Sequence, residues 1–76
     1  MKKDTIQCIS AKVLLRIIKK RQELGISQMD LAFKLNLSSN GYFKIEKGNT
    51  KLSVLRLLQI AEVLNVSPVV FFEDYR

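Results

Sequence analysis

One short stretch of the chain carries side chains suited to a hydrogen-bonding, anionic partner. At about 100° per residue, a helix over residues 39–47 gathers them on an arc of roughly 140° that has no acidic residue. Asparagine can make two hydrogen bonds to adenine, lysine can donate to guanine, and an aromatic ring can pack on a thymine methyl group. The pattern therefore suits the reading of base edges by Ser39, Asn40, Phe43 and Lys44, with Lys47 on the same arc placed for phosphate.

A solvated helix face could carry the same residue types, because asparagine and lysine are common on protein surfaces. Phe43 could equally lie at the edge of a core, since Tyr42 and Ile45 on the opposite side of this helix are expected to be buried. The neighbouring elements favour the base-reading interpretation.

The first of two short helices is predicted over residues 28–35. Ser27 is suited to the N-cap position, and Asp30 follows three residues later, as in a capping box. Asn36 can adopt the left-handed conformation that ends a helix. Apolar residues recur between them at helical spacing, at Leu31, Ala32 and Leu35.

The second short helix, over residues 39–47, follows almost at once. Ser38 supplies its N-cap and Gly48 its C-cap. Asn40-Gly41 is also a hairpin-turn dipeptide, but the residues before it do not alternate as a strand would, so the helix is favoured. The turn between the two helices is short enough to make them pack across each other.

A longer helix is predicted to precede this unit, over residues 10–24, with Ser10 as N-cap and Gly25 at its end. Residues 1–9 are expected to form a flexible arm. Such a basic amphipathic helix could lie on a membrane, but a core this small needs its apolar residues. Those residues are Val13, Leu14, Ile17, Ile18 and Leu24.

The C-terminal third holds more apolar residues than one small core can bury. Ser53 and Ser67 are predicted to cap helices over residues 54–65 and 68–74. The core arc of the first holds Val54, Leu57, Leu58, Ala61 and Leu64. Off this arc lie Leu55, Ile60 and Val63, and Val69, Val70, Phe71 and Phe72 follow. A homodimer is therefore expected, with candidate interface residues Leu55, Val63, Val69 and Phe72.

The composition fits one small domain, residues 1–76, with a polyanionic partner. Thirteen Lys and Arg residues against seven Asp and Glu give a net charge of +6. There is no histidine, and Cys8 is the only cysteine, so neither a zinc site nor an enzyme centre based on histidine is expected, and no cofactor. Polar residues interrupt every apolar stretch, which predicts a cytoplasmic protein without a membrane span.

Many spaced residues also agree with one known pattern: Arg21, Gly25, Ser27-Gln28, Leu31-Ala32, Asn36, Ser38 and Ile45-Glu46-Lys47-Gly48, continuing through Leu57-Leu58, Ala61 and Leu64 to Val66. Over about residues 13–72 the chain thus resembles the helix-turn-helix domains of lambda-type phage repressors and Cro proteins, the XRE type. The resemblance implies an all-α, five-helix, lambda-repressor-like fold. In size and in its C-terminal residues 69–73 the chain is also similar to the controller proteins of restriction–modification systems.

Position by position, the resemblance implies a set of roles. Base contacts would come from Gln28, Ser39, Asn40 and Lys44, with Phe43 at a position that is usually polar. Phosphate contacts would come from Ser27, Lys47, Asn49 and Lys51. Arg21 and Glu46 would form a structural ion pair. Met29 and Phe33 depart from the family, since they are apolar where it is usually polar.

The sequence therefore predicts a transcriptional regulator that binds double-stranded DNA as a homodimer on an inverted repeat. It leaves open whether the dimer represses by covering a promoter or activates by contacting RNA polymerase. The alternative is a protein-interaction module, such as an antitoxin that uses its apolar C-terminal surface. Enzyme activity is not expected.

Overall fold

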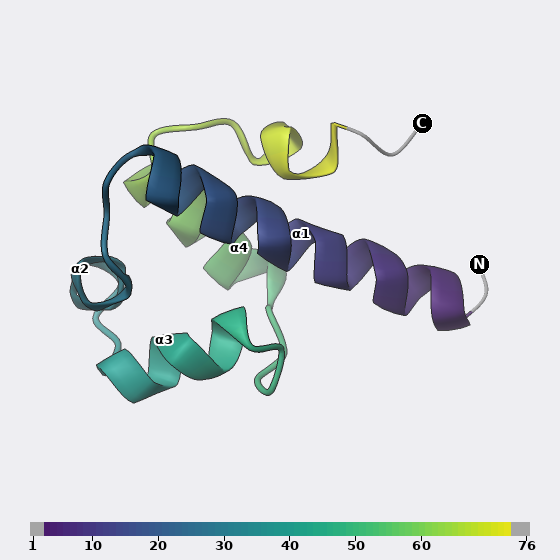
Figure 1. Cartoon of the computed structure of the whole chain (residues 1–76), viewed down its shortest axis with the longest axis horizontal. Coiled ribbons are helices and arrows are strands. Elements are labelled where there is room, and N and C mark those ends of the chain that lie inside the picture. The colour runs from purple at the N-terminus through teal and green to yellow at the C-terminus, as the bar shows by residue number, and fades with distance from the viewer. Residues whose placement is uncertain (1–2, 74–76) are drawn as a thin grey trace.

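The computed structural model describes residues 3–73, which form four α-helices and one 3-10 helix (Figure 1). The long helix α1 crosses the middle of the molecule, with η1 above it and α3 below it in this view, and α2 is seen end-on. Helix α2 packs against α3 and α4, and η1 packs against α1 and α4. The elements are α1 (Lys3–Glu23), α2 (Gln28–Lys34), α3 (Ser39–Glu46), α4 (Val54–Val63) and η1 (Pro68–Phe72).

Two helix predictions are corrected. The expected fifth α-helix is a 3-10 helix of five residues, within which Phe71 is buried, and residue 74 lies outside the described residues. The first helix begins at Lys3, so residues 3–9 are helical and do not form the expected arm. No glycine or proline interrupts α1, and the helix therefore continues past Ser10 toward the N-terminus.

The helix ends follow the predicted capping residues. In all four serine caps the side-chain oxygen accepts a backbone N–H, at 3.0 Å for Ser27, Ser38 and Ser53 and at 3.3 Å for Ser67. Asn36 adopts φ 58° after α2, and Gly48 adopts φ 79° after α3. The left-handed conformations thus lie where the sequence places them, and they keep the turns short.

One core unites the helices, and it includes the predicted buried face of α3, with Tyr42 fully buried and Ile45 5% exposed. The buried apolar residues are Val13, Ile17, Leu31, Ala32, Leu35, Tyr42, Ile45, Ile60, Ala61, Leu64 and Phe71.

The core arc predicted for α4 is correct at Leu57, Ala61 and Leu64 and wrong at Val54 and Leu58. Val54 and Leu58 are exposed, at 74% and 48%, whereas Ile60 is fully buried. Contacts with α2 and η1 select the stripe that runs through residues 57, 60, 61 and 64, which the apolar sequence of this helix left ambiguous. Leu24, expected in the core, is 47% exposed because α1 ends before it.

Within residues 3–73, no helix combines the length and the apolar character that crossing a bilayer requires.

Candidate DNA-binding surface

The unit formed by α2 and α3 rests on a short, internally bonded turn. The Leu37 N–H donates to the Ala32 carbonyl at 2.9 Å, and the Asn36 N–H donates to the Phe33 carbonyl at 3.1 Å. The Leu37 side chain is half-buried and packs against the core. These contacts fix the second helix against the first, which is the geometry a helix-turn-helix needs to present one helix to DNA.

Helix α3 has two distinct faces. Opposite the buried Tyr42 and Ile45, the side chains of Asn40 and Lys44 are exposed, as is Lys47 just after the helix. Ser39 and Phe43, on the same arc, are half-buried.

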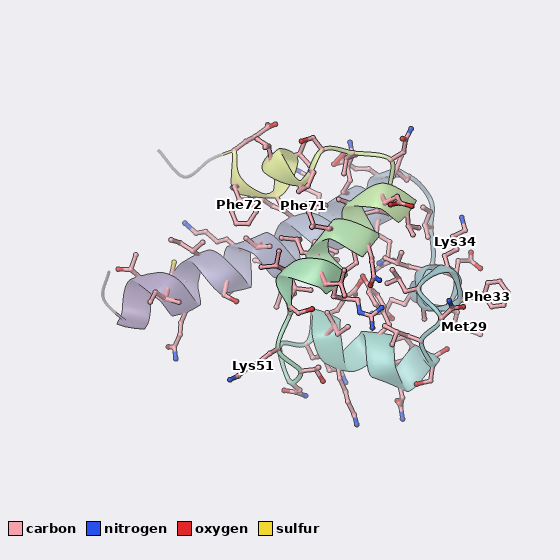
Figure 2. All side chains as sticks on the ribbon, turned by 180° about the vertical axis from the view of Figure 1, so that it is seen from behind. Met29, Phe33, Lys34, Lys51, Phe71 and Phe72 are labelled. Atoms are coloured by element: carbon pink, nitrogen blue, oxygen red, sulfur yellow. The ribbon has the colours of Figure 1, made fainter. Side chains whose placement is uncertain are left out.

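The predicted phosphate contacts are all at accessible positions. Ser27, Asn49 and Lys51 are exposed, the last two in the loop that follows α3. The Ser27 oxygen accepts the Asp30 N–H, which leaves its own hydroxyl proton free to donate to an anion. Lys51 lies at the end of the molecule where α3 lies, well away from Lys34 on α2 (Figure 2).

A buried ion pair joins α1 to the end of α3. Arg21 Nε donates to Glu46 Oε2 at 2.7 Å, and Arg21 Nη2 donates to Glu46 Oε1 at 3.2 Å. The Arg21 and Glu46 side chains are only 9% and 4% exposed. Arg21 Nη1 also donates to the Ile26 carbonyl at 2.9 Å, so the guanidinium holds the loop before α2 as well.

Gln28 is joined to this pair, which the sequence did not reveal. Its Nε2 donates to Glu46 Oε1 at 2.7 Å, and the side chain is half-buried at the first position of α2. Gln28 and Glu46 are 18 positions apart, and no periodic signal in the sequence indicates this contact. One carboxylate therefore binds side chains from both α1 and α2.

Burial and hydrogen bonding compete at Glu46. Burial favours the protonated acid. The hydrogen bonds and the charge of Arg21, with a hydrogen bond from Gln28, outweigh burial, so the pKa of Glu46 is lowered from its ordinary value. Burial, with a smaller contribution from Glu46, raises the pKa of the neighbouring Tyr42 phenol. The buried Tyr42 hydroxyl meets no partner at good hydrogen-bonding geometry among the described residues. At neutral pH the cluster therefore holds an ionised Glu46 beside a neutral Tyr42.

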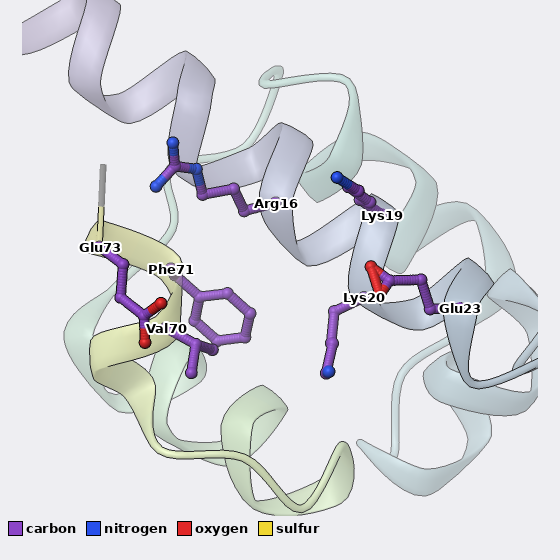
Figure 3. A pocket seen from close by; sticks show the side chains of 7 residues that line it. All are labelled: Arg16, Lys19, Lys20, Glu23, Val70, Phe71 and Glu73. Carbon is purple, nitrogen blue, oxygen red and sulfur yellow. The ribbon is translucent and has the colours of Figure 1, made fainter. Parts of the chain in front are cut away.

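Other surface features do not belong to α3. Met29 and Phe33, on α2, are 65% and 81% exposed and point outward (Figure 2). A shallow cavity of about 260 Å³ lies between α1 and η1 (Figure 3). Basic and acidic side chains both line it, among them Arg16, Lys19, Lys20, Glu23 and Glu73, so its charge is mixed. Because η1 and α3 lie on opposite sides of α1, this cavity does not belong to the candidate DNA-binding surface.

Comparison with known proteins agrees with this geometry. The profile of the helix-turn-helix family matches residues 17–71. Two curated proteins, each named an uncharacterized HTH-type transcriptional regulator, come from Sinorhizobium medicae (strain WSM419) and Rhizobium meliloti (strain 1021). Each is 39% identical over 59 residues, which cover 78% of this chain and 42% of the relative. No solved structure matches significantly. With its two-helix unit, its capped turn and a family match over most of its length, the chain belongs to the XRE-type helix-turn-helix family.

Proposed function

We propose that this chain is the DNA-binding domain of a transcriptional regulator, with α3 in the major groove. The observation that carries the proposal is the exposure of Asn40, Lys44 and Lys47 on α3, opposite the face that anchors the helix in the core. The names of the two curated relatives support the regulatory role, and the family is one of DNA-binding regulators, not a class of enzymes. The chain spans 42% of the length of these relatives, so the proposal concerns the domain.

The direct test is selection of bound sequences from a random duplex library. Enrichment of one sequence with two inverted half-sites is expected. If the protein retains no duplex and instead co-purifies with one tightly bound protein partner, the antitoxin-like alternative is supported.

Base reading and phosphate binding respond differently to substitution. Asn40→Ala or Lys44→Ala is expected to cost about 1–3 kcal/mol of binding free energy on the selected site, and to relax discrimination at one base pair per half-site. Lys51→Ala is expected to weaken binding to all sequences alike, because it removes a phosphate contact only. Repeating the selection with each variant measures the difference. Unchanged base preference in Asn40→Ala would show that the wrong face has been assigned.

We further propose that the domain binds as a homodimer through its C-terminal apolar surface. Leu55, Val69 and Phe72 are 67%, 64% and 42% exposed, and Val54 and Leu58 beside Leu55 on α4 add to that surface. Val63 is half-buried against its own core and leaves less area for a partner. Phe71 is buried in the core of its own subunit, so Phe72 is the phenylalanine available to a second subunit (Figure 2).

Two-fold pairing buries the same apolar patch on both subunits. It would place the two α3 helices about 34 Å apart, one turn of DNA, and so predicts half-site centres roughly 10–11 base pairs apart.

Phe72→Asp is expected to give a folded monomer, because the two-fold contact would bury a charge in the apolar patch of both subunits. Binding to the full repeat should fall by about 100-fold, equivalent to about 2.7 kcal/mol, while a single half-site is still bound weakly. Sedimentation at micromolar concentration measures the oligomeric state. Phe33→Asp, which changes an exposed phenylalanine on α2, is the matched control and should sediment as the wild type does. A wild-type monomer that binds half-sites as tightly as the repeat would contradict the dimer.

A further inference from the structure

The orientation of the Gln28 carboxamide is fixed by chemistry as well as by distance. A carboxylate has no proton to donate, so the Gln28 atom that lies 2.7 Å from Glu46 Oε1 is the amide nitrogen. That bond uses one of the two N–H groups. The other N–H and the carbonyl oxygen of Gln28 remain for a partner outside the cluster.

We propose that Glu46 is a positioning residue for DNA recognition, which holds the Gln28 carboxamide so that it offers DNA one donor and one acceptor. The inference rests on the proposed function and deepens it. In the major groove, adenine presents a matching acceptor and donor at N7 and N6, whereas a phosphate only accepts and can use the N–H alone. Gln28 held in this way is suited to read a base.

The ion pair between Arg21 and Glu46 explains why the Gln28 carboxamide is held in a fixed orientation. Glu46 Oε1 accepts from both Gln28 and Arg21, and Glu46 Oε2 accepts from Arg21 at 2.7 Å. Because the carboxylate is 4% exposed, water hardly competes for these bonds. The rotamer freedom of Gln28 is thus lost on folding and not on binding, which raises both affinity and selectivity.

Substitutions of Arg21 and of Glu46 are predicted to differ in their effect on base preference. This difference separates a positioning role of Glu46 from a role in stability alone. The guanidinium of Arg21 donates to Glu46 and to the Ile26 carbonyl, and its link to Gln28 runs through the Glu46 carboxylate. Arg21→Lys keeps a cation beside Glu46, and should lower the thermal stability while the base preference is retained. Glu46→Gln removes the obligate acceptor, so the facing amide groups can flip.

The experiment compares Gln28→Ala, Glu46→Gln and Arg21→Lys with the wild type, below the melting temperature of each. Selection from a random duplex library measures base preference. Gln28→Ala should lose about 5- to 150-fold of discrimination at one base pair per half-site. Glu46→Gln should reduce discrimination at the same base pair several-fold. The double variant Gln28→Ala/Glu46→Gln should be no less selective at that base pair than Gln28→Ala alone. Arg21→Lys should leave that base pair unchanged.

Side-chain amide NMR of the free protein tests the hold without DNA. In the wild type and in Arg21→Lys, the resonance of one Gln28 amide proton should be shifted downfield and the proton should be protected from exchange with solvent. In Glu46→Gln, neither the shift nor the protection is expected. A folded Glu46→Gln variant with wild-type base preference, additive losses in the double variant, or an unprotected Gln28 amide would overturn the positioning role alone. Wild-type protein that binds no duplex at all would overturn the proposed function together with it.

Discussion

Affinity for duplex DNA is expected to fall by about 10³–10⁵ between 50 and 200 mM salt. The reason is the charge of the candidate DNA-binding surface, where Lys44, Lys47 and Lys51 are exposed and α3 has no acidic residue on its outward arc. A dimer that neutralises about 6–10 phosphates releases a similar number of counterions, and the logarithm of its affinity falls with a slope of about −0.9 per phosphate.

Fluorescence anisotropy of a labelled duplex across a salt titration measures this slope. Lys51→Ala should reduce its magnitude by about 1 for each subunit that contacts DNA. Lys34→Ala removes an exposed lysine from α2, away from α3, and should leave the slope unchanged (Figure 2). Binding that is insensitive to salt would contradict a phosphate-dominated interface.

Glu46→Ala is expected to lower the free energy of unfolding by roughly 3–5 kcal/mol, because it leaves the Arg21 guanidinium buried without its carboxylate. A chain of 76 residues is expected to have about 4–11 kcal/mol of stability in total. One substitution therefore removes a large part of it. Urea denaturation measures the loss, and Glu62→Ala, which changes an exposed glutamate on α4, should stay close to the wild type.

The same carboxylate predicts a pH dependence. Because the pKa of Glu46 is lower in the folded chain than its ordinary value of 4.5, its ionised form stabilises the fold fully above that pH. This contribution is lost as the pH falls through the folded-state pKa. Wild-type stability should consequently fall more steeply below pH 4.5 than that of Glu46→Ala. Parallel acid profiles would show that Glu46 is not held in its ionised form.

Local chemistry explains which parts of the fold could be predicted from the sequence. The N-caps at Ser27, Ser38 and Ser53 and the left-handed Asn36 were predicted correctly, because each depends on one side chain and its immediate backbone. The buried face of α3 was also predicted, since polar and apolar residues alternate there with a clear helical period.

Packing decided the features that the sequence left ambiguous. Almost every side of α4 is apolar, so contacts with α2 and η1 choose which residues are buried, and Ile60 takes the place expected for Leu58. Likewise, a proline-initiated segment of five residues can be α or 3-10, and the geometry that inserts Phe71 decides between them. The bond between Gln28 and Glu46 joins residues whose proximity arises only when α2 and α3 have packed.

Helices α2 and α3 have seven and eight residues. Isolated helices of fewer than about 12 residues are barely populated in water, because nucleation costs more than so few bonds return. A peptide of residues 27–48 should therefore be mostly unstructured, and transplanting it into an unrelated scaffold should not transfer DNA binding. The unit that could be transferred is larger. Helix α1 supplies Arg21 to the ion pair with Glu46, and α4 supplies Ile60 and Ala61, with its C-cap Leu64, to the core.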